Sequence, residues 1–153
     1  MTTYRFRVKL EYDPTSLWRD VVLGADRTLD EFQTVLNRSI GLDQDHLWFF
    51  GTDQDYWQSP VQYKRPEEME HPGPTMGDEN EYDAAETTVG EMVRQLTLEA
   101  GDRICYLFDY GDEWRFYGIL KEVDEDAPDD HEPTVVNEKG APVDQYAPPG
   151  ERL

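Results

Sequence analysis

The 153-residue chain contains little cysteine, histidine or lysine, and these scarcities exclude several kinds of site. Cys105 is the only cysteine, so no internal disulfide and no cysteine-rich metal cage can form within one chain. Because it stands between Ile104 and Tyr106 in an apolar run, we expect a buried structural thiol rather than a nucleophile. The three histidines are scattered along the sequence and supply few nitrogen ligands.

The sequence also lacks a long hydrophobic run. No apolar stretch approaches the roughly 18 residues that a membrane span requires. A strand-like pattern begins directly at the N-terminus, where a targeting segment would otherwise stand. These features predict a cytoplasmic protein with no membrane segment.

Positive charge is scarce too, since 34 acidic residues against 14 basic residues leave a formal net charge of −20. Such a surface repels DNA, RNA and anionic lipid, which argues against nucleic acid as a partner. Acids spread along the whole chain suit a salt-rich cytoplasm, where ions shorten the range of like-charge repulsion. The alternatives are an acidic protein of an ordinary cell and a nucleic-acid mimic, in which the acidic runs 78–86 and 124–132 imitate phosphates.

Hydrophobic residues nevertheless make up 37% of the chain and aromatic residues 12%, enough for a core in one domain. The clearest strand is predicted at 4–12, where rings and aliphatic side chains alternate with mostly charged ones. Turn residues at 13–16 and an extended pattern at 17–23 predict that this strand starts an antiparallel hairpin.

Two capping boxes predict the starts of two helices. Thr28 and Glu31 open the first, whose helical periodicity ends at Gly41. The sequence 88–91 opens a second, shorter helix that we expect to end near Gly101. A short buried strand is predicted at 46–50 and a second hairpin at 104–120, with an Asp-Tyr-Gly-Asp turn at its tip.

Residues 1–123 are predicted to form a single α+β domain. Within it, 51–87 reads as a long loop or insertion with ragged strand pieces around 56–57 and 61–63, because periodicity fails and prolines and acids accumulate. Residues 124–153 form an acidic, proline-rich tail, either flexible or draped over the domain. The order of elements predicts a mainly antiparallel sheet of about five strands with two helices on one face, in a β-grasp-like arrangement.

Five short motifs follow one another between residues 4 and 123. They are Tyr4-Arg5-Phe6-Arg7-Val8-Lys9-Leu10, Leu17-Trp18-Arg19, Thr28-Leu29 at a helix start, His46-Leu47-x-Phe49-Phe50, and Phe108-Asp109-Tyr110-Gly111-Asp112-x-Trp114. Together they resemble the Orf3-like protein family of plasmid pRiA, also described as passenger proteins of an insertion element. The resemblance implies a link to mobile genetic elements, but no established activity, because members are described as of unknown function.

The chain departs from this family at positions that matter for chemistry. As the resemblance implies, typical members carry a second histidine two residues after the position that matches His46. They carry a further histidine two residues after the position that matches Trp114. Trp48 and Phe116 stand at those positions here. The family's proline-rich segment near the end is reduced to residues 148–151. If the family's histidines and acids form a metal or acid–base site, this member lacks most of its nitrogen ligands.

The bend of the second hairpin concentrates acids. Asp109, Asp112 and Glu113 stand within five residues, and His46 would join them if its strand neighbours the hairpin. These four residues are the candidate catalytic groups of a divalent-metal-dependent, hydrolase-like enzyme, with His46, Asp109 and Asp112 as candidate metal ligands. Turn-forming aspartates that bond their own backbone amides are commoner than ligands, so we favour a structural role and expect no cofactor.

Cations and rings support a different hypothesis. Arg5, Arg7 and Lys9, together with Arg19, would form a basic stripe on the solvent face of the first hairpin, able to receive an acidic peptide or a phosphate backbone. The alternative is that these cations pair with acids of the hairpin, such as Glu11 and Asp20. An aromatic groove beside the sheet is the other candidate, because four tryptophans are many for one small core. The candidate binding residues are Trp18, Trp48, Trp114, Tyr110, Arg5, Arg7 and Lys9. We therefore favour a non-enzymatic module that binds a protein or peptide through its sheet face or aromatic groove.

Overall fold

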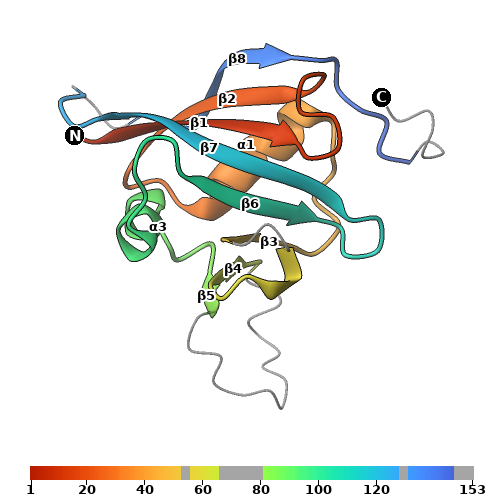
Figure 1. Ribbon diagram of the computed structural model, residues 1–153, viewed down its shortest axis with the longest axis horizontal. Helices are drawn as coiled ribbons and strands as arrows, with labels where there is room; N and C mark the ends of the chain where they lie inside the picture. Colours follow the sequence, from red (N-terminus) through yellow and green to blue (C-terminus); the bar gives the residue numbers. More distant parts are fainter. Residues whose placement is uncertain (53–55, 66–80, 128–130, 147–153) are drawn as a thin grey trace.

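The computed structural model describes residues 1–52, 56–65, 81–127 and 131–146 (Figure 1). Within these ranges the strands form one eight-stranded sheet in the order β5-β4-β3-β6-β7-β1-β2-β8. The strands are β1 Thr3–Leu10, β2 Trp18–Gly24, β3 Trp48–Gly51, β4 Gln62–Lys64, β5 Glu81–Asp83, β6 Arg103–Phe108, β7 Trp114–Asp124 and β8 Thr134–Lys139. The helices are α1 Leu29–Ile40, the short 3-10 helix η1 Tyr56–Gln58, and α3 Val89–Leu96.

The expected β-grasp-like sheet of about five mainly antiparallel strands is wrong, although the molecule is α+β. Among the described residues the sheet has eight strands and is mixed, because β4 and β5 pair in parallel. The additional strands β4, β5 and β8 lie at the two ends of the sheet. β4 and β5 are three residues long, and β8 is exposed except at Val135, so none of them buries an alternating set of side chains that would leave a period-two signal.

β1 follows the alternation that the sequence predicts. Tyr4, Phe6, Val8 and Leu10 are buried, while the side chains between them are partly exposed. β2 pairs with β1 antiparallel as the other half of the first hairpin. β6 and β7 pair antiparallel as the second expected hairpin, with Phe108 opposite residue 114 at the turn and residue 103 opposite 119 at the far end. Both predicted hairpins are therefore confirmed.

Both helices start where predicted, with a complete capping box at α1 and, at α3, the Thr88 side chain accepting from the Glu91 amide. The Thr28 hydroxyl accepts a hydrogen bond from the Glu31 amide at 3.2 Å, and the Glu31 carboxylate accepts one from the Thr28 amide at 3.3 Å. α1 ends where predicted, because Gly41 adopts the left-handed conformation that stops the helix. α3 ends earlier than expected, at the left-handed Thr97 rather than near Gly101.

Both helices pack against one face of the sheet. Apolar side chains of α1 and α3 join those of β1, β2, β6 and β7 in a single core, and α1 lies behind the strands in Figure 1. We call the other face, which carries the alternate side chains of the strands, the open face. η1 covers part of it, where Tyr56 packs with Phe49, Cys105 and Leu107 in a second, smaller cluster. No helix in the described ranges is long and apolar enough to cross a membrane.

The segments expected to be a loop and a tail contain regular structure. In 51–87 the strand piece expected around 61–63 corresponds to β4, whereas 56–57 belong to the 3-10 helix η1 and β5 was not predicted; 53–55 and 66–80 lie outside the described residues. The expected tail contributes β8, which pairs antiparallel with β2 and extends the sheet beyond the first hairpin. The open face therefore continues from the centre of the sheet onto residues far along the chain.

Candidate functional site

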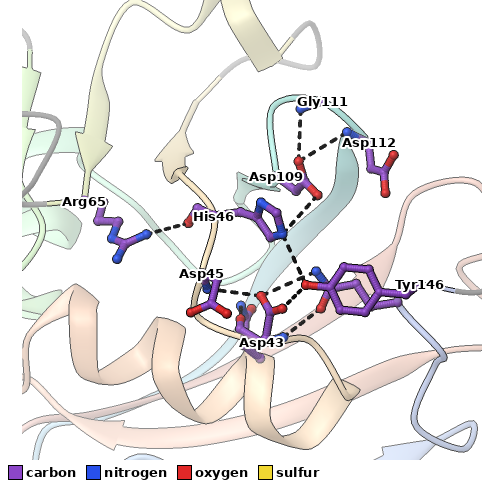
Figure 2. Close-up of polar contacts among 10 residues, drawn as sticks. Asp43, Asp45, His46, Arg65, Asp109, Gly111, Asp112 and Tyr146 are labelled. Carbon is purple, nitrogen blue, oxygen red and sulfur yellow. Dashed lines mark hydrogen bonds and ion pairs between the residues drawn. The ribbon is translucent and has the colours of Figure 1, made fainter.

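The sheet register brings His46 to the bend acids, as the metal hypothesis requires. His46 precedes β3 and Asp109 follows β6, and these strands pair with residue 48 opposite residue 108. The His46 Nε2 lies 3.7 Å from Asp109 Oδ2 and 3.3 Å from the Tyr146 hydroxyl (Figure 2). The histidine ring also meets Phe108 edge-on, with ring centroids 5.8 Å apart. His46 is therefore half-buried and held by contacts on several sides.

The Asp109 carboxylate organises the turn. Its Oδ1 accepts hydrogen bonds from the amides of Gly111, at 3.0 Å, and Asp112, at 3.3 Å (Figure 2). Its carbonyl accepts a further bond from the Glu113 amide at 2.6 Å. Asp109 adopts a left-handed backbone, with φ of 64°, which aspartate tolerates better than most residues. One of its two carboxylate oxygens is thus engaged by the bend itself.

The other bend acids do not converge on His46. The Asp112 side chain points away from the imidazole in Figure 2. Glu113 Oε1 accepts hydrogen bonds from Arg115, at 2.7 Å, and from Trp57 Nε1, at 3.1 Å, and the Arg115 contact leads in holding the pKa of Glu113 below its ordinary value. Among the described residues, no group of three or more histidine, cysteine or acidic side chains is placed to hold a metal ion. The structure joins His46 to Asp109 and leaves Asp112 and Glu113 outside that pair.

A contact that the sequence does not predict ties the chain's last described residues to this region. The Tyr146 hydroxyl donates a short hydrogen bond to Asp43, and the neighbouring Gln145 accepts one from the Asp43 amide at 2.7 Å (Figure 2). Partial burial raises the pKa of the Asp43 carboxyl, but the bonds from Tyr146, the Asp45 amide and Gln145 together lower it more. The same contact raises the pKa of Tyr146 to about 12. No periodicity marks these residues in the sequence, so only the folded chain reveals the contact.

The predicted basic stripe forms on the open face but is partly neutralised. Asp20, directly opposite Arg7 across β1 and β2, bonds Arg5 at 2.6 Å and Arg7 at 2.7 Å. The Arg7 guanidinium also lies 4.1 Å from the centroid of the Trp18 ring. Of the two acids expected to pair with the stripe, Asp20 does so, whereas Glu11 lies 4.0 Å from Arg115 instead.

Arg19 does not belong to this stripe, which corrects the prediction. Its side chain is 1% exposed and donates hydrogen bonds to four backbone carbonyls, at 2.8 to 3.3 Å. These carbonyls lie at the end of α1, in β2 and at the end of β8. The reason is strand alternation, since Arg19 is adjacent to Trp18 and Asp20 and must project to the opposite face. Arg19 is a structural residue that joins three elements.

Cations and rings alternate in a row across the open face. Residues directly opposite one another in paired strands share a face, so the register aligns Cys105, Tyr117, Lys9, Trp18 and Lys139 across four adjoining pairs. Among the described residues, neither the Lys9 nor the Lys139 ammonium forms an ion pair. We call this set the transverse row. Because all its members except Cys105 are partly or fully exposed, it is a surface feature and not part of the core.

Two predicted binding residues lie in the core. Trp48 and Trp114 are each 1% exposed, so neither lines a surface groove. Trp18 remains half-buried in the transverse row, and Tyr110 is half-buried against Trp57, with ring centroids 4.7 Å apart. Trp57 itself is 41% exposed. Of the aromatic residues predicted to bind, Trp18 and Tyr110 therefore remain partly exposed, and the sequence alone does not distinguish them from the buried rings.

Two adjoining cavities open at the start of β6. The first, of about 260 Å³, is lined by residues that include Thr52, Tyr56, Arg103 and Tyr117. The second, of about 450 Å³, also contains Thr52 and Arg103 and extends to the end of α3. Cys105 borders the first cavity but is 4% exposed, with Sγ 3.6 Å from a serine hydroxyl, as expected for a structural thiol.

Comparison with known proteins places the chain in a family. A family model described as plasmid pRiA4b ORF-3-like protein matches residues 2–147. No curated protein matches the chain. The crystal structure of a protein of unknown function from Methanosarcina mazei Go1 is similar in fold, with a TM-score of 0.62 and 12% identity over 92% of this chain and 72% of that chain. The chain thus belongs to the plasmid pRiA4b ORF-3-like protein family, in agreement with the resemblance of its motifs.

Proposed function

We propose that this chain is a non-enzymatic interaction module that binds a protein or peptide through the open face of its sheet. The transverse row is the observation that carries the proposal. Its rings provide apolar contact area with little conformational entropy to lose, and its ammonium groups provide charge at each side of Trp18. Aromatic residues and cations are the side chains that binding surfaces concentrate.

The charge of the whole molecule sharpens this argument. The chain has 34 acidic and 14 basic residues, and Asp20 alone pairs with two cations of the open face. Lys9 and Lys139 flank Trp18 without such a partner among the described residues. An anionic molecule that keeps a local cationic surface repels most polyanions at long range and accepts a short acidic segment at short range. A protein or peptide partner therefore fits better than nucleic acid.

The competing metal-dependent enzyme has less support from geometry. Catalysis requires acids and an imidazole around one shared cavity with an open coordination position. His46 and Asp109 approach each other, but one Asp109 oxygen accepts hydrogen bonds from the amides of its own turn, and Glu113 bonds Arg115. A carboxylate that holds a turn has less freedom to reorganise around an ion.

In this proposal the module acts in a cytoplasm of high ionic strength and serves a mobile genetic element. The family's description as plasmid-encoded supports the second part. The net charge of −20 supports the first, because a salt-rich solvent screens the repulsion between clustered carboxylates.

Site-specific crosslinking tests the proposed binding face. The change Tyr117→p-benzoylphenylalanine puts a photoreactive group in the transverse row, and Arg38→p-benzoylphenylalanine puts the same group on exposed α1, against the other face. We expect a discrete protein adduct in native lysate from position 117 only. Excess unmodified chain should abolish it, whereas excess chain carrying Lys9→Glu should not. Equal adducts at both positions, or competition by the Lys9→Glu chain, would contradict the proposal.

A further inference from the structure

The two cavities at the start of β6 meet at a shared pair of residues, Thr52 and Arg103. The first extends from this pair across the open face toward Tyr117, which belongs to the transverse row. The second extends in the other direction, over Val61, to the end of α3 at Leu96 and Leu98. The two cavities adjoin at Thr52 and Arg103, one on each side, and we call the pair of cavities the β6 groove.

Arg103 is an available cation at the centre of the β6 groove. Its side chain is exposed, and its guanidinium lies 4.8 Å from the centroid of the Tyr117 ring. Two acids line the groove, but neither pairs with it within the described part of the chain. Glu11 approaches Arg115 at 4.0 Å, and Asp102 accepts a hydrogen bond from the Glu99 amide at 2.8 Å.

The Thr52 hydroxyl is a second polar group at the same point. Its oxygen is buried and has no hydrogen-bond partner among the described residues, although the Thr52 amide donates to the Ser59 hydroxyl at 3.0 Å. Leaving a buried polar group unpaired costs free energy, which a hydrogen-bonding ligand would recover. Arg103 offers a charged fork to an anionic group, and Thr52 places a polar side chain beside it in the lining of both cavities.

We propose that the β6 groove binds an extended peptide segment whose acidic side chain meets Arg103 and whose apolar neighbours occupy the two cavities. This inference rests on the proposed function and names the partner's chemistry. A guanidinium matches a carboxylate through paired, charge-assisted hydrogen bonds. Apolar side chains fit the flanking cavities, where Tyr56 and Ile104 line one half and Leu96 and Leu98 the other.

The geometry also selects the position of the acid. Since the groove continues on both sides of Arg103, the bound chain continues in both directions, and a terminal carboxylate would leave one half empty. Glu11 and Asp102 stand on the two sides and repel further acids there. The ligand is therefore a single internal Asp or Glu between apolar residues, rather than a polyanion.

Selection from a displayed peptide library tests this assignment with the full chain. The library presents random heptapeptides between Gly-Ser linkers, so that every carboxylate is internal. We expect enrichment of one Asp or Glu with apolar residues on both sides. The Arg103→Gln chain should bind such a peptide about tenfold more weakly or worse, the loss expected for one charge-assisted pair. The difference between the two chains should be smaller in concentrated KCl, because salt screens the charge pair. The matched change Arg94→Gln, at an exposed position of α3 outside the groove, should leave binding unchanged.

The outcomes separate this inference from the proposed function. Selected peptides without an acid, or with affinity unaffected by Arg103→Gln, overturn the groove assignment. If Lys9→Glu abolishes binding of those same peptides, the open face still binds and the proposed function stands. An empty selection also overturns the groove assignment, and the crosslinking at position 117 then decides the proposed function independently. Tighter, Arg103-dependent binding of an oligothymidylate would overturn the choice of a peptide.

Discussion

The Arg7 guanidinium and the Asp20 carboxylate face each other across β1 and β2 through two hydrogen bonds, Nε to Oδ1 at 2.7 Å and Nη2 to Oδ2 at 3.0 Å. Arg5 adds a third bond to Oδ2 at 2.6 Å. The Asp20 side chain is fully buried. One carboxylate therefore fixes two cations of the open face and holds Arg7 against Trp18.

The change Asp20→Asn should lower the free energy of unfolding by about 1–3 kcal/mol, because two guanidinium groups lose their charged acceptor. We place the effect below that of a fully buried ion pair, since both arginines are partly exposed and can be hydrated. Denaturant unfolding measures it. The change Asp26→Asn, at an exposed position, is the matched control and should be nearly neutral. Equal effects of the two changes would show that the arginines do not depend on Asp20.

Asp20 should also contribute to acid unfolding. Burial raises the pKa of its carboxyl, but the hydrogen bonds and charges of Arg7 and Arg5 lower it more, so the folded pKa lies below the ordinary value of about 4. The folded state then binds fewer protons than the unfolded state. The stabilisation is present above about pH 4 and is lost as the pH falls through the folded pKa. Unfolding free energies measured at decreasing pH should decline less steeply below pH 4 in the Asp20→Asn chain, and parallel curves would contradict this.

The strands and helices that bury one face could be predicted from the sequence. β1 alternates because one side meets the core, and α1 begins and ends where its capping box and Gly41 require. β8 could not be predicted, because most of its side chains are exposed and backbone pairing with β2 holds it in place. The carbonyls of residues 139 and 140 are in turn bound by Arg19, which the sequence suggested was on the surface.

The residue types of the candidate site could be predicted from the sequence, but the orientations of their side chains could not. The spacing of Asp109, Asp112 and Glu113 indicates a bend but leaves open which carboxylates converge. The left-handed backbone of Asp109 and Glu113 determines which carboxylates converge, because each such residue turns the chain and redirects the next side chain. Likewise, composition indicates that some rings must be exposed, yet only the register shows that Trp18 is among them while Trp48 is not.

Arg19→Lys should lower the free energy of unfolding by about 2–4 kcal/mol, because an ammonium group cannot reach all the carbonyls that the planar guanidinium binds. Those carbonyls belong to α1, β2 and β8, so the loss should loosen β8 first. Hydrogen exchange of the β8 amides should accelerate more than that of β6. Arg38→Lys, at an exposed position of α1, provides the control. Unchanged exchange in β8 would refute the bridging role of Arg19.

Two changes at Asp109 separate the turn hypothesis from the metal hypothesis. Asp109→Asn retains an oxygen acceptor for the amides of Gly111 and Asp112 and tolerates the left-handed backbone, so its stability should stay within about 0.5 kcal/mol. Asp109→Ala loses both features and should cost about 1–3 kcal/mol. Calorimetric titration with Mg²⁺, Mn²⁺ and Zn²⁺ accompanies the unfolding measurements. Saturable heats in the original chain that disappear in Asp109→Asn would instead support a metal site with His46.

Salt should stabilise this protein, because its formal charge of −20 opposes compaction. Raising KCl from 0.1 to 1 M shortens the screening length from about 10 to 3 Å, which removes repulsion between most surface carboxylates. We expect the unfolding temperature to rise by about 5–10 °C, corresponding to about 2–3 kcal/mol for a chain of this size. The combined change Glu86→Gln, Glu99→Gln and Glu125→Gln removes three exposed charges and should raise the unfolding temperature at low salt while reducing the further gain from KCl. The opposite result, with the same KCl gain before and after neutralisation, would mean that salt acts through hydration of the folded chain, because charge screening must diminish with the number of charges screened.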